Sequence, residues 1–110
     1  MMGRDAEQAR CYSEISDDLS KIAAYESNAE LRTQLFNMSS DYKSLAHYFW
    51  TVDERAGLRR AGIEVADTEE QLQATRDVRA TLVRLQAQWR LLAQKLDGER
   101  APQPSRPAGD

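Results

Sequence analysis

Apolar side chains recur at intervals of three and four residues through most of the chain, which is the period of an amphipathic α-helix. In the first such segment Tyr12, Ile15, Leu19 and Ile22 share one apolar stripe. This spacing predicts a helix over residues 5–24. Because a helix with such a stripe is not stable alone in water, the stripe is expected to pack on another element.

The longest stripe lies in the middle of the chain and predicts a helix over residues 28–56. It steps by four and three through Leu31, Leu35, Met38, Tyr42, Leu45, Phe49, Val52 and Ala56. The preceding Ser27-Asn28-Ala29-Glu30 has the pattern of a capping box that begins at the serine. Gly57 and Gly62 suit the end of this helix and a reversal of the chain.

A third stripe predicts a helix over residues 68–97, with Asp67 or Thr68 as its N-cap. The same four-three alternation runs through Val78, Leu82, Leu85, Trp89, Leu92 and Leu96. The basic residues of this segment fall opposite the stripe and are expected to face water: Arg76, Arg79, Arg84, Arg90 and Lys95. Residues 98–110 hold all three prolines and no apolar side chain larger than alanine, so we expect a disordered tail.

These elements predict an all-α protein with one helical domain over residues 1–97. The second and third helices are joined by a short, glycine-marked connection and should form an antiparallel helical hairpin with coiled-coil-like stripes. Two arrangements of the first helix remain open. It can close a three-helix bundle within one chain, or it can leave an apolar strip that a second copy must cover.

Consecutive aromatic residues favour the second arrangement. The side chains of Tyr48-Phe49-Trp50 cannot all face one narrow stripe, so they widen the apolar surface beyond what one helix pair uses. The protein is therefore expected to be a noncatalytic protein–protein interaction module that self-associates, as a homodimer. The predicted interface comprises Leu35, Met38, Tyr42, Leu45, Tyr48, Phe49, Trp50, Leu82, Leu85, Trp89 and Leu92.

Charge disfavours a protein whose main work is binding nucleic acid. Fifteen Lys and Arg residues against eighteen Asp and Glu residues give a net charge of -3, which does not attract a phosphate backbone through bulk charge. The alternative function is a nucleic-acid-binding or regulatory protein that uses the basic face of the third helix. Its candidate anion contacts are Arg59, Arg60, Arg76, Arg79 and Arg90, although a solvated basic face needs no function.

The sequence predicts no catalytic residues, no cofactor site and no metal site, and hence a protein that is not an enzyme. His47 is the only histidine and Cys11 the only cysteine, so these residue types cannot supply the ligands of a zinc site. We interpret His47 as a boundary residue beside the apolar stripe and Cys11 as a small, partly buried helix residue. The carboxylates of Asp17-Asp18 and Glu69-Glu70 fall at exposed or capping positions, unlike a catalytic acid–base pair.

The N-terminal residues are polar, and no apolar run approaches the roughly 20 residues of a membrane-spanning helix. Neither a signal peptide nor a membrane segment is expected. Because the single cysteine cannot form an internal disulfide, we expect a reducing cytoplasm as the location.

Three short motifs follow one another between residues 9 and 46: Ala9-x-Cys11-Tyr12, Leu31-Arg32-x-Gln34-Leu35 and Tyr42-x-x-Leu45-Ala46. With these motifs the chain resembles short all-helical bacterial proteins of unknown function. Such proteins usually have a proline-marked turn where this chain has Ser27-Asn28. The resemblance implies a helical hairpin in a bacterial cytoplasm, and it implies no activity.

Overall fold

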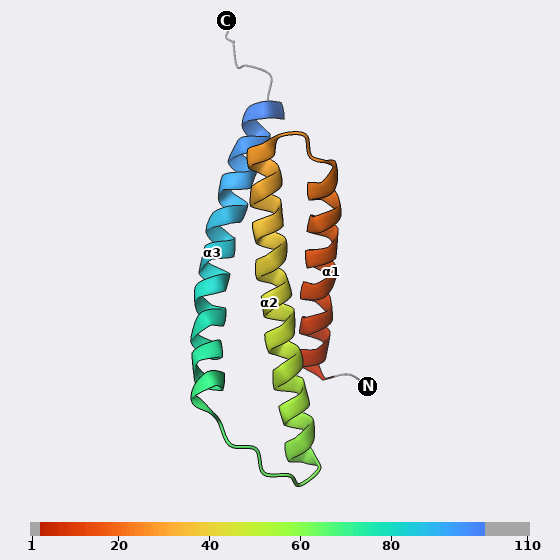
Figure 1. Ribbon diagram of the computed structural model, residues 1–110, viewed down its shortest axis with the longest axis vertical. Helices are drawn as coiled ribbons and strands as arrows, with labels where there is room; N and C mark the ends of the chain where they lie inside the picture. The colour runs from red at the N-terminus through yellow and green to blue at the C-terminus, as the bar shows by residue number, and fades with distance from the viewer. Residues whose placement is uncertain (1–2, 101–110) are drawn as a thin grey trace, which may run out of the picture.

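Three long helices make up the part of the chain that the computed structural model describes, residues 3–100, with side-chain surroundings for residues 3–97. They are α1 (Arg4–Tyr25), α2 (Ala29–Arg60) and α3 (Glu69–Arg100). Figure 1 shows α2 in the middle, with α1 on one side and α3 on the other, each antiparallel to α2. The molecule measures 70 × 26 × 24 Å. The predicted all-α fold of antiparallel helices is therefore confirmed.

Asn28, rather than the predicted Ser27, caps the start of α2. Its Oδ1 accepts hydrogen bonds from the backbone N–H groups of Glu30 and Leu31, at 3.0 and 3.1 Å. The side chain of Glu26, not that of Glu30, accepts from the Asn28 N–H. The capping box beginning at Ser27 was thus wrong by one residue, because asparagine accepts at the N-cap as well as serine does and lies nearer the first helical residue.

The second helix runs past Gly57 to Arg60, four residues beyond its predicted end. A glycine inside a helix costs only about 1 kcal/mol relative to alanine, which is too little to stop a helix with favourable neighbours. The chain leaves the helix at Gly62, whose φ of 86° is left-handed. There the N–H groups of Gly62 and Ile63 donate to the carbonyls of Arg59 and Leu58, which is the Schellman pattern.

Thr68 caps the third helix, as one of the two predicted candidates, because its Oγ1 accepts from the Gln71 N–H at 3.1 Å. The helix ends at Arg100 rather than at residue 97, so the first three residues of the predicted tail are helical. The other residues of that predicted tail, 101–110, lie outside the described residues.

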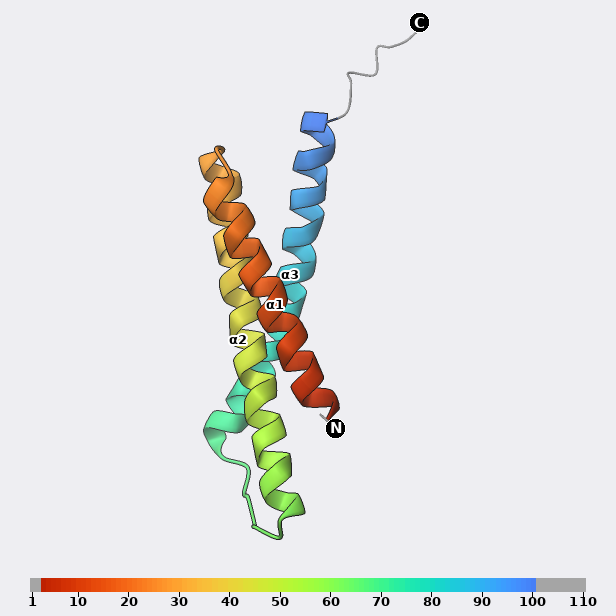
Figure 2. The ribbon, with the colours of Figure 1, turned by 90° about the vertical axis from the view of Figure 1, so that its right-hand side faces the viewer.

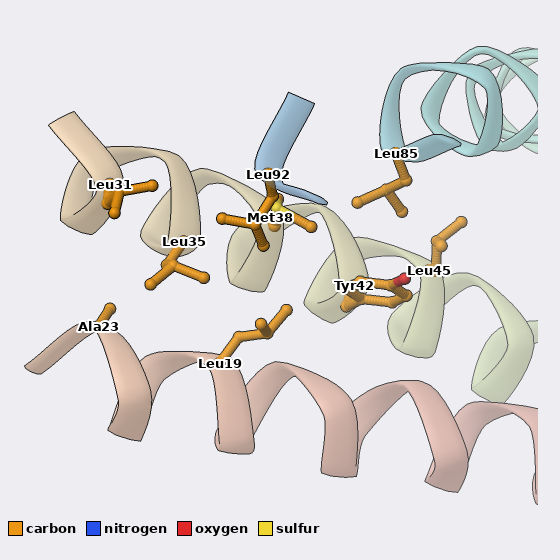
Figure 3. Close-up of a cluster of buried hydrophobic side chains, with 9 residues drawn as sticks. All are labelled: Leu19, Ala23, Leu31, Leu35, Met38, Tyr42, Leu45, Leu85 and Leu92. Atoms are coloured by element: carbon orange, nitrogen blue, oxygen red, sulfur yellow. The ribbon is translucent and has the colours of Figure 1, made fainter. Parts of the chain in front are cut away.

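The core forms where all three helices contribute apolar side chains around the middle of α2 (Figure 3). Met38 and Leu45 are the most deeply buried large side chains, with 0% and 1% of their surface exposed. Leu19 reaches this core from α1, and Leu85 and Leu92 reach it from α3. The predicted stripe of α2 is therefore the centre of the core.

Small residues form the contact between α1 and α2. Ala9, Ser16 and Ala23, spaced seven residues apart, are all buried on α1. Ser16 Oγ donates to the Ser39 carbonyl at 2.8 Å, and Ser39 Oγ donates to the Ser16 carbonyl at 2.7 Å. A hydroxyl on so short a side chain can reach a carbonyl of the opposite helix only when the two backbones lie close together. The contact between α1 and α2 is therefore a close helix crossing.

The predicted stripe of α1 was wrong at Ile22, which is 55% exposed. Leu19 is buried as expected, while Tyr12 and Ile15 pack at the edge of the core. The error arises because the small residues, rather than the largest apolar ones, define the side of α1 that faces α2.

Long polar side chains form much of the contact between α2 and α3. The Arg84 guanidinium donates two hydrogen bonds to the Asp41 carboxylate, at 3.0 and 2.9 Å. The Lys95 ammonium donates to Glu30 Oε1 at 2.7 Å. Arg84 and Lys95, which were expected to face water on the outer side of the helix, thus reach across to α2. Sequence periodicity alone does not show the acidic partners on another helix.

These two ion pairs shift the ionisation of their members. The hydrogen bonds and the charge of Asp41 raise the pKa of the Arg84 guanidinium. The hydrogen bond from Lys95, and then its charge, lower the pKa of the Glu30 carboxyl. Both pairs favour the charged forms of their members.

In the described residues, the backbones of α1 and α3 do not approach each other closely. Among the described residues no Cα of α1 lies within 8 Å of a Cα of α3. Figure 2 shows the C-terminal half of α3 diverging from the α1–α2 pair. The first helix therefore covers one side of α2 and leaves the side between α1 and α3 without a closing helix.

Candidate interaction surface

Six of the predicted interface residues are buried within the chain itself. They pack around α2 in the contacts between its own helices: Leu35, Met38, Tyr42, Leu45, Leu85 and Leu92. In this structure these side chains stabilise the fold of one chain. A surface that contacts a partner protein must therefore be formed by exposed residues.

The three consecutive aromatic residues of α2 point in different directions. Phe49 lies with its ring centroid 5.7 Å from that of Tyr12 on α1. The hydroxyl of Tyr48 lies 3.0 Å from Thr75 Oγ1 on α3. Trp50 is 45% exposed and follows Ala46 by four residues, on the side of α2 that faces α1. The rings of Tyr48 and Phe49 pack edge to face, with centroids 5.1 Å apart, so these two residues form one group that contacts both outer helices.

A line of large apolar side chains remains exposed on α3. Leu82, Trp89 and Leu96 are spaced by seven residues, so they lie along one side of the helix, and they are 38%, 41% and 38% exposed. Trp89 Nε1 donates to the Tyr42 hydroxyl at 2.6 Å, and the Tyr42 ring lies 5.7 Å from that of Tyr12 on α1. The line therefore lies on the side of α3 that faces α1.

Two isoleucines of α1 lie on the side that faces this line. Ile15 packs at the edge of the core, and Ile22, seven residues later, is exposed. The opposite side of α1 is marked by Ser20, whose Oγ lies 2.9 Å from Ser39 Oγ. We refer to Ile15, Ile22, Leu82, Trp89 and Leu96 together as the α1–α3 face.

The predicted interface included Leu82 and Trp89 of this face and missed the other three members. Leu96 has the same heptad spacing as Leu82 and Trp89, so the signal was present in the sequence. Ile15 and Ile22 were assigned to the contact with the rest of the chain. The small residues at positions 9, 16 and 23 form the side of α1 that faces α2. Their spacing was the signal that the isoleucines lie beside this contact and not within it.

The five predicted anion contacts do not gather in one place. Arg59 donates to the Val65 carbonyl and to Asp67, at the connection between α2 and α3. Arg76 donates to Gln73 Oε1 at 2.8 Å on its own helix. Arg60, Arg79 and Arg90 are exposed, and none of them forms an ion pair with another of residues 3–97. Arg90, two residues after Gln88 and its contact with Gln34, lies toward the opposite end of the molecule from Arg59.

His47 lines a hollow of about 510 Å³ between α2 and α3. The charged residues around this hollow are of both signs: Arg55, Glu70 and Asp77. Arg55 is occupied by hydrogen bonds to the Ala66 carbonyl and to Asp67. The lining therefore presents no concentrated charge to a ligand.

Cys11 is exposed, which corrects the expectation that it is partly buried. It lies on the outer side of α1, away from the small residues that face α2. Across the described part of the chain, the structure shows no cluster of three or more His, Cys, Asp and Glu residues that could hold a metal ion. None of the described helices has the length and apolarity needed to span a membrane.

No protein-family model, curated protein or solved structure matches this chain. The resemblance of residues 9–46 to short helical bacterial proteins therefore stays a prediction.

Proposed function

We propose that this protein is a noncatalytic interaction module of the cytoplasm that self-associates through the α1–α3 face. The observation that supports the proposal is the line of Leu82, Trp89 and Leu96, which remains partly exposed in the described residues, on the side of α3 that faces α1. Large apolar side chains grouped on one face of a small protein are typical of a protein–protein contact. Aromatic anchors such as Trp89 are enriched among the residues that dominate binding energy.

A noncatalytic role fits the placement of the reactive side chains. His47 and Cys11 stand on different helices, and Cys11 is exposed. The carboxylates of Asp41 and Glu30 are engaged by Arg84 and Lys95. These groups stabilise the helix contacts and are not held free in a concave site, as acid–base catalysis requires.

Self-association is tested by light scattering after size exclusion at micromolar concentration. The expected mass is twice the 12.5 kDa of one chain. Leu82→Glu and Leu96→Glu, which place charges in the proposed contact, are expected to raise the dissociation constant by about tenfold or more. Leu91→Glu is the matched control, because Leu91 is 52% exposed on the same helix, on the side opposite to this line. A wild-type protein that remains a 12.5 kDa monomer contradicts the proposal.

The alternative is a nucleic-acid or regulatory binder that uses the exposed arginines of α3, Arg79 and Arg90. It is supported by their exposure and weakened by the separation of Arg59 and Arg60 from them. Titration of labelled duplex and single-stranded DNA and RNA distinguishes the two functions. A phosphate contact weakens steeply between 50 and 200 mM salt, whereas a largely apolar self-association does not. We expect no binding at the higher salt, and salt-sensitive submicromolar binding that Arg79→Ala and Arg90→Ala abolish would favour the alternative.

A further inference from the structure

Interhelical contacts fix how the three helices are aligned along their length. Ser16 of α1 lies beside Ser39 of α2, and Asp41 of α2 lies beside Arg84 of α3. Because both pairs of helices are antiparallel, counting outward from these contacts places Cys11 of α1 at about the level of Thr81 of α3, two residues from Arg79. The same count places position n of α1 near position n + 70 of α3.

The α1–α3 face has an acidic margin on one helix and a basic margin on the other. On α1, Glu14 and Asp18 lie beside the isoleucines, on the outer side. On α3, Arg79 and Arg90 lie beside the line of Leu82 and Trp89, also on the outer side. All four charged side chains are exposed, and none pairs with an opposite charge elsewhere in residues 3–97.

We propose that the partner is a second copy of this chain, placed face to face across a twofold axis parallel to the helices. This inference rests on the proposed self-association and specifies its geometry. Such an axis exchanges the two margins, so that α1 of each copy packs against α3 of the other. It also keeps each residue at the same height along the helix axis as the identical residue of the second copy.

The levels of the charges support this axis. In the dimer Asp18 falls at the level of Gln88 in the second copy, two residues from Arg90 of that copy. Glu14 falls at the level of Arg84, about one and a half helical turns from Arg79. Asp18 therefore meets Arg90, and Glu14 lies on the same margin as Arg79. A twofold axis perpendicular to the helices would instead place α1 on α1 and α3 on α3, with like charges opposed, which costs binding energy.

A disulfide trap tests the arrangement directly. Arg79→Cys places a cysteine within two residues of the level of the native Cys11 in the second copy, so mild oxidation is expected to yield a covalent dimer on a nonreducing gel. A disulfide within one chain is excluded, since bonded cysteines have Cα atoms 4.4–6.8 Å apart and no Cα of α1 lies within 8 Å of α3 in the described residues.

Two controls make the trap specific. Lys43→Cys introduces an exposed cysteine on α2 at nearly the same level, on the side away from the α1–α3 face, and is expected to give no covalent dimer. The wild-type protein has Cys11 alone, and it is also expected to give no covalent dimer on the nonreducing gel. Efficient cross-linking of the wild type through Cys11 would place α1 against α1 and overturn the parallel axis.

Charge reversal supplies a second, independent readout. The pair Arg79→Glu with Arg90→Glu is expected to raise the dissociation constant by about tenfold, and so is the pair Glu14→Lys with Asp18→Lys. Combining all four substitutions is expected to restore dimerisation, because opposite charges again meet. Failure of this rescue in a protein that still dimerises overturns the arrangement alone. A monomeric wild type overturns the proposed self-association itself.

Discussion

Replacing Met38 by alanine is expected to lower the free energy of unfolding by about 3 kcal/mol, measured by urea denaturation at one fixed protein concentration. Met38 lies at the centre of α2 with none of its surface exposed, and Leu19 and Leu92 approach it from the two outer helices. Shortening this side chain leaves a cavity bounded by three helices. None of them can close the cavity without moving away from the others.

Phe36→Ala is the matched control for this cavity. It removes more carbon atoms than Met38→Ala does, from a position on the same helix that is 44% exposed. We expect its cost to stay near 1 kcal/mol, because the phenylalanine ring is already partly in water. If the two variants lost the same free energy of unfolding, the outer helices would not bury Met38.

Replacing Ser39 by leucine is expected to destabilise the protein by about 3 kcal/mol, through overpacking and the loss of its hydroxyl. Ser39 is buried at the close crossing of α1 and α2, where its Oγ donates to the Ser16 carbonyl. Three further carbon atoms at this position must push the two helices apart. The measurement is thermal or urea unfolding followed by circular dichroism.

The neighbouring serine provides the control for this crossing. Ser40→Leu makes the same chemical change on the exposed side of α2 and is expected to change stability by less than about 0.5 kcal/mol. Ser39→Ala, which removes only the hydroxyl, should cost about 1 to 2 kcal/mol. A Ser39→Leu protein as stable as the wild type would mean that the crossing tolerates a large side chain.

The number and approximate extent of the helices could be predicted because large apolar residues on α2 recur with helical period. Leu31, Leu35, Met38, Tyr42 and Leu45 are all buried, as their spacing indicates. The exact ends could not be predicted in the same way. A cap depends on which of two adjacent side chains accepts the first amides, and Asn28 does so rather than Ser27.

The side that each outer helix presents to α2 was harder to predict. On α1, hydrophobicity gives most weight to Ile15 and Ile22, whereas close packing selects Ala9, Ser16 and Ala23. Small residues have little hydrophobic signal of their own, and their importance becomes visible only when another backbone lies against them. The isoleucines are displaced to the margin, where they join the candidate surface.

The partners of Arg84 and Lys95 could not be predicted from their own helix. Asp41 and Glu30 lie 43 and 65 residues away along the chain. Periodicity identifies the side of a helix on which a charge lies. Only the alignment of α2 with α3 shows that an opposite charge is within reach, and that this side of α3 is part of a helix contact.

The different ways in which the two outer helices are attached imply a graded local stability. The contact of α1 with α2 is made by short side chains at close range, and its hydrogen bonds are buried. The contact of α3 includes exposed ion pairs, which dissolved salt weakens because it screens their attraction. Rising ionic strength should therefore loosen α3 while the α1–α2 pair stays folded, so that local unfolding of this protein begins at its C-terminal helix.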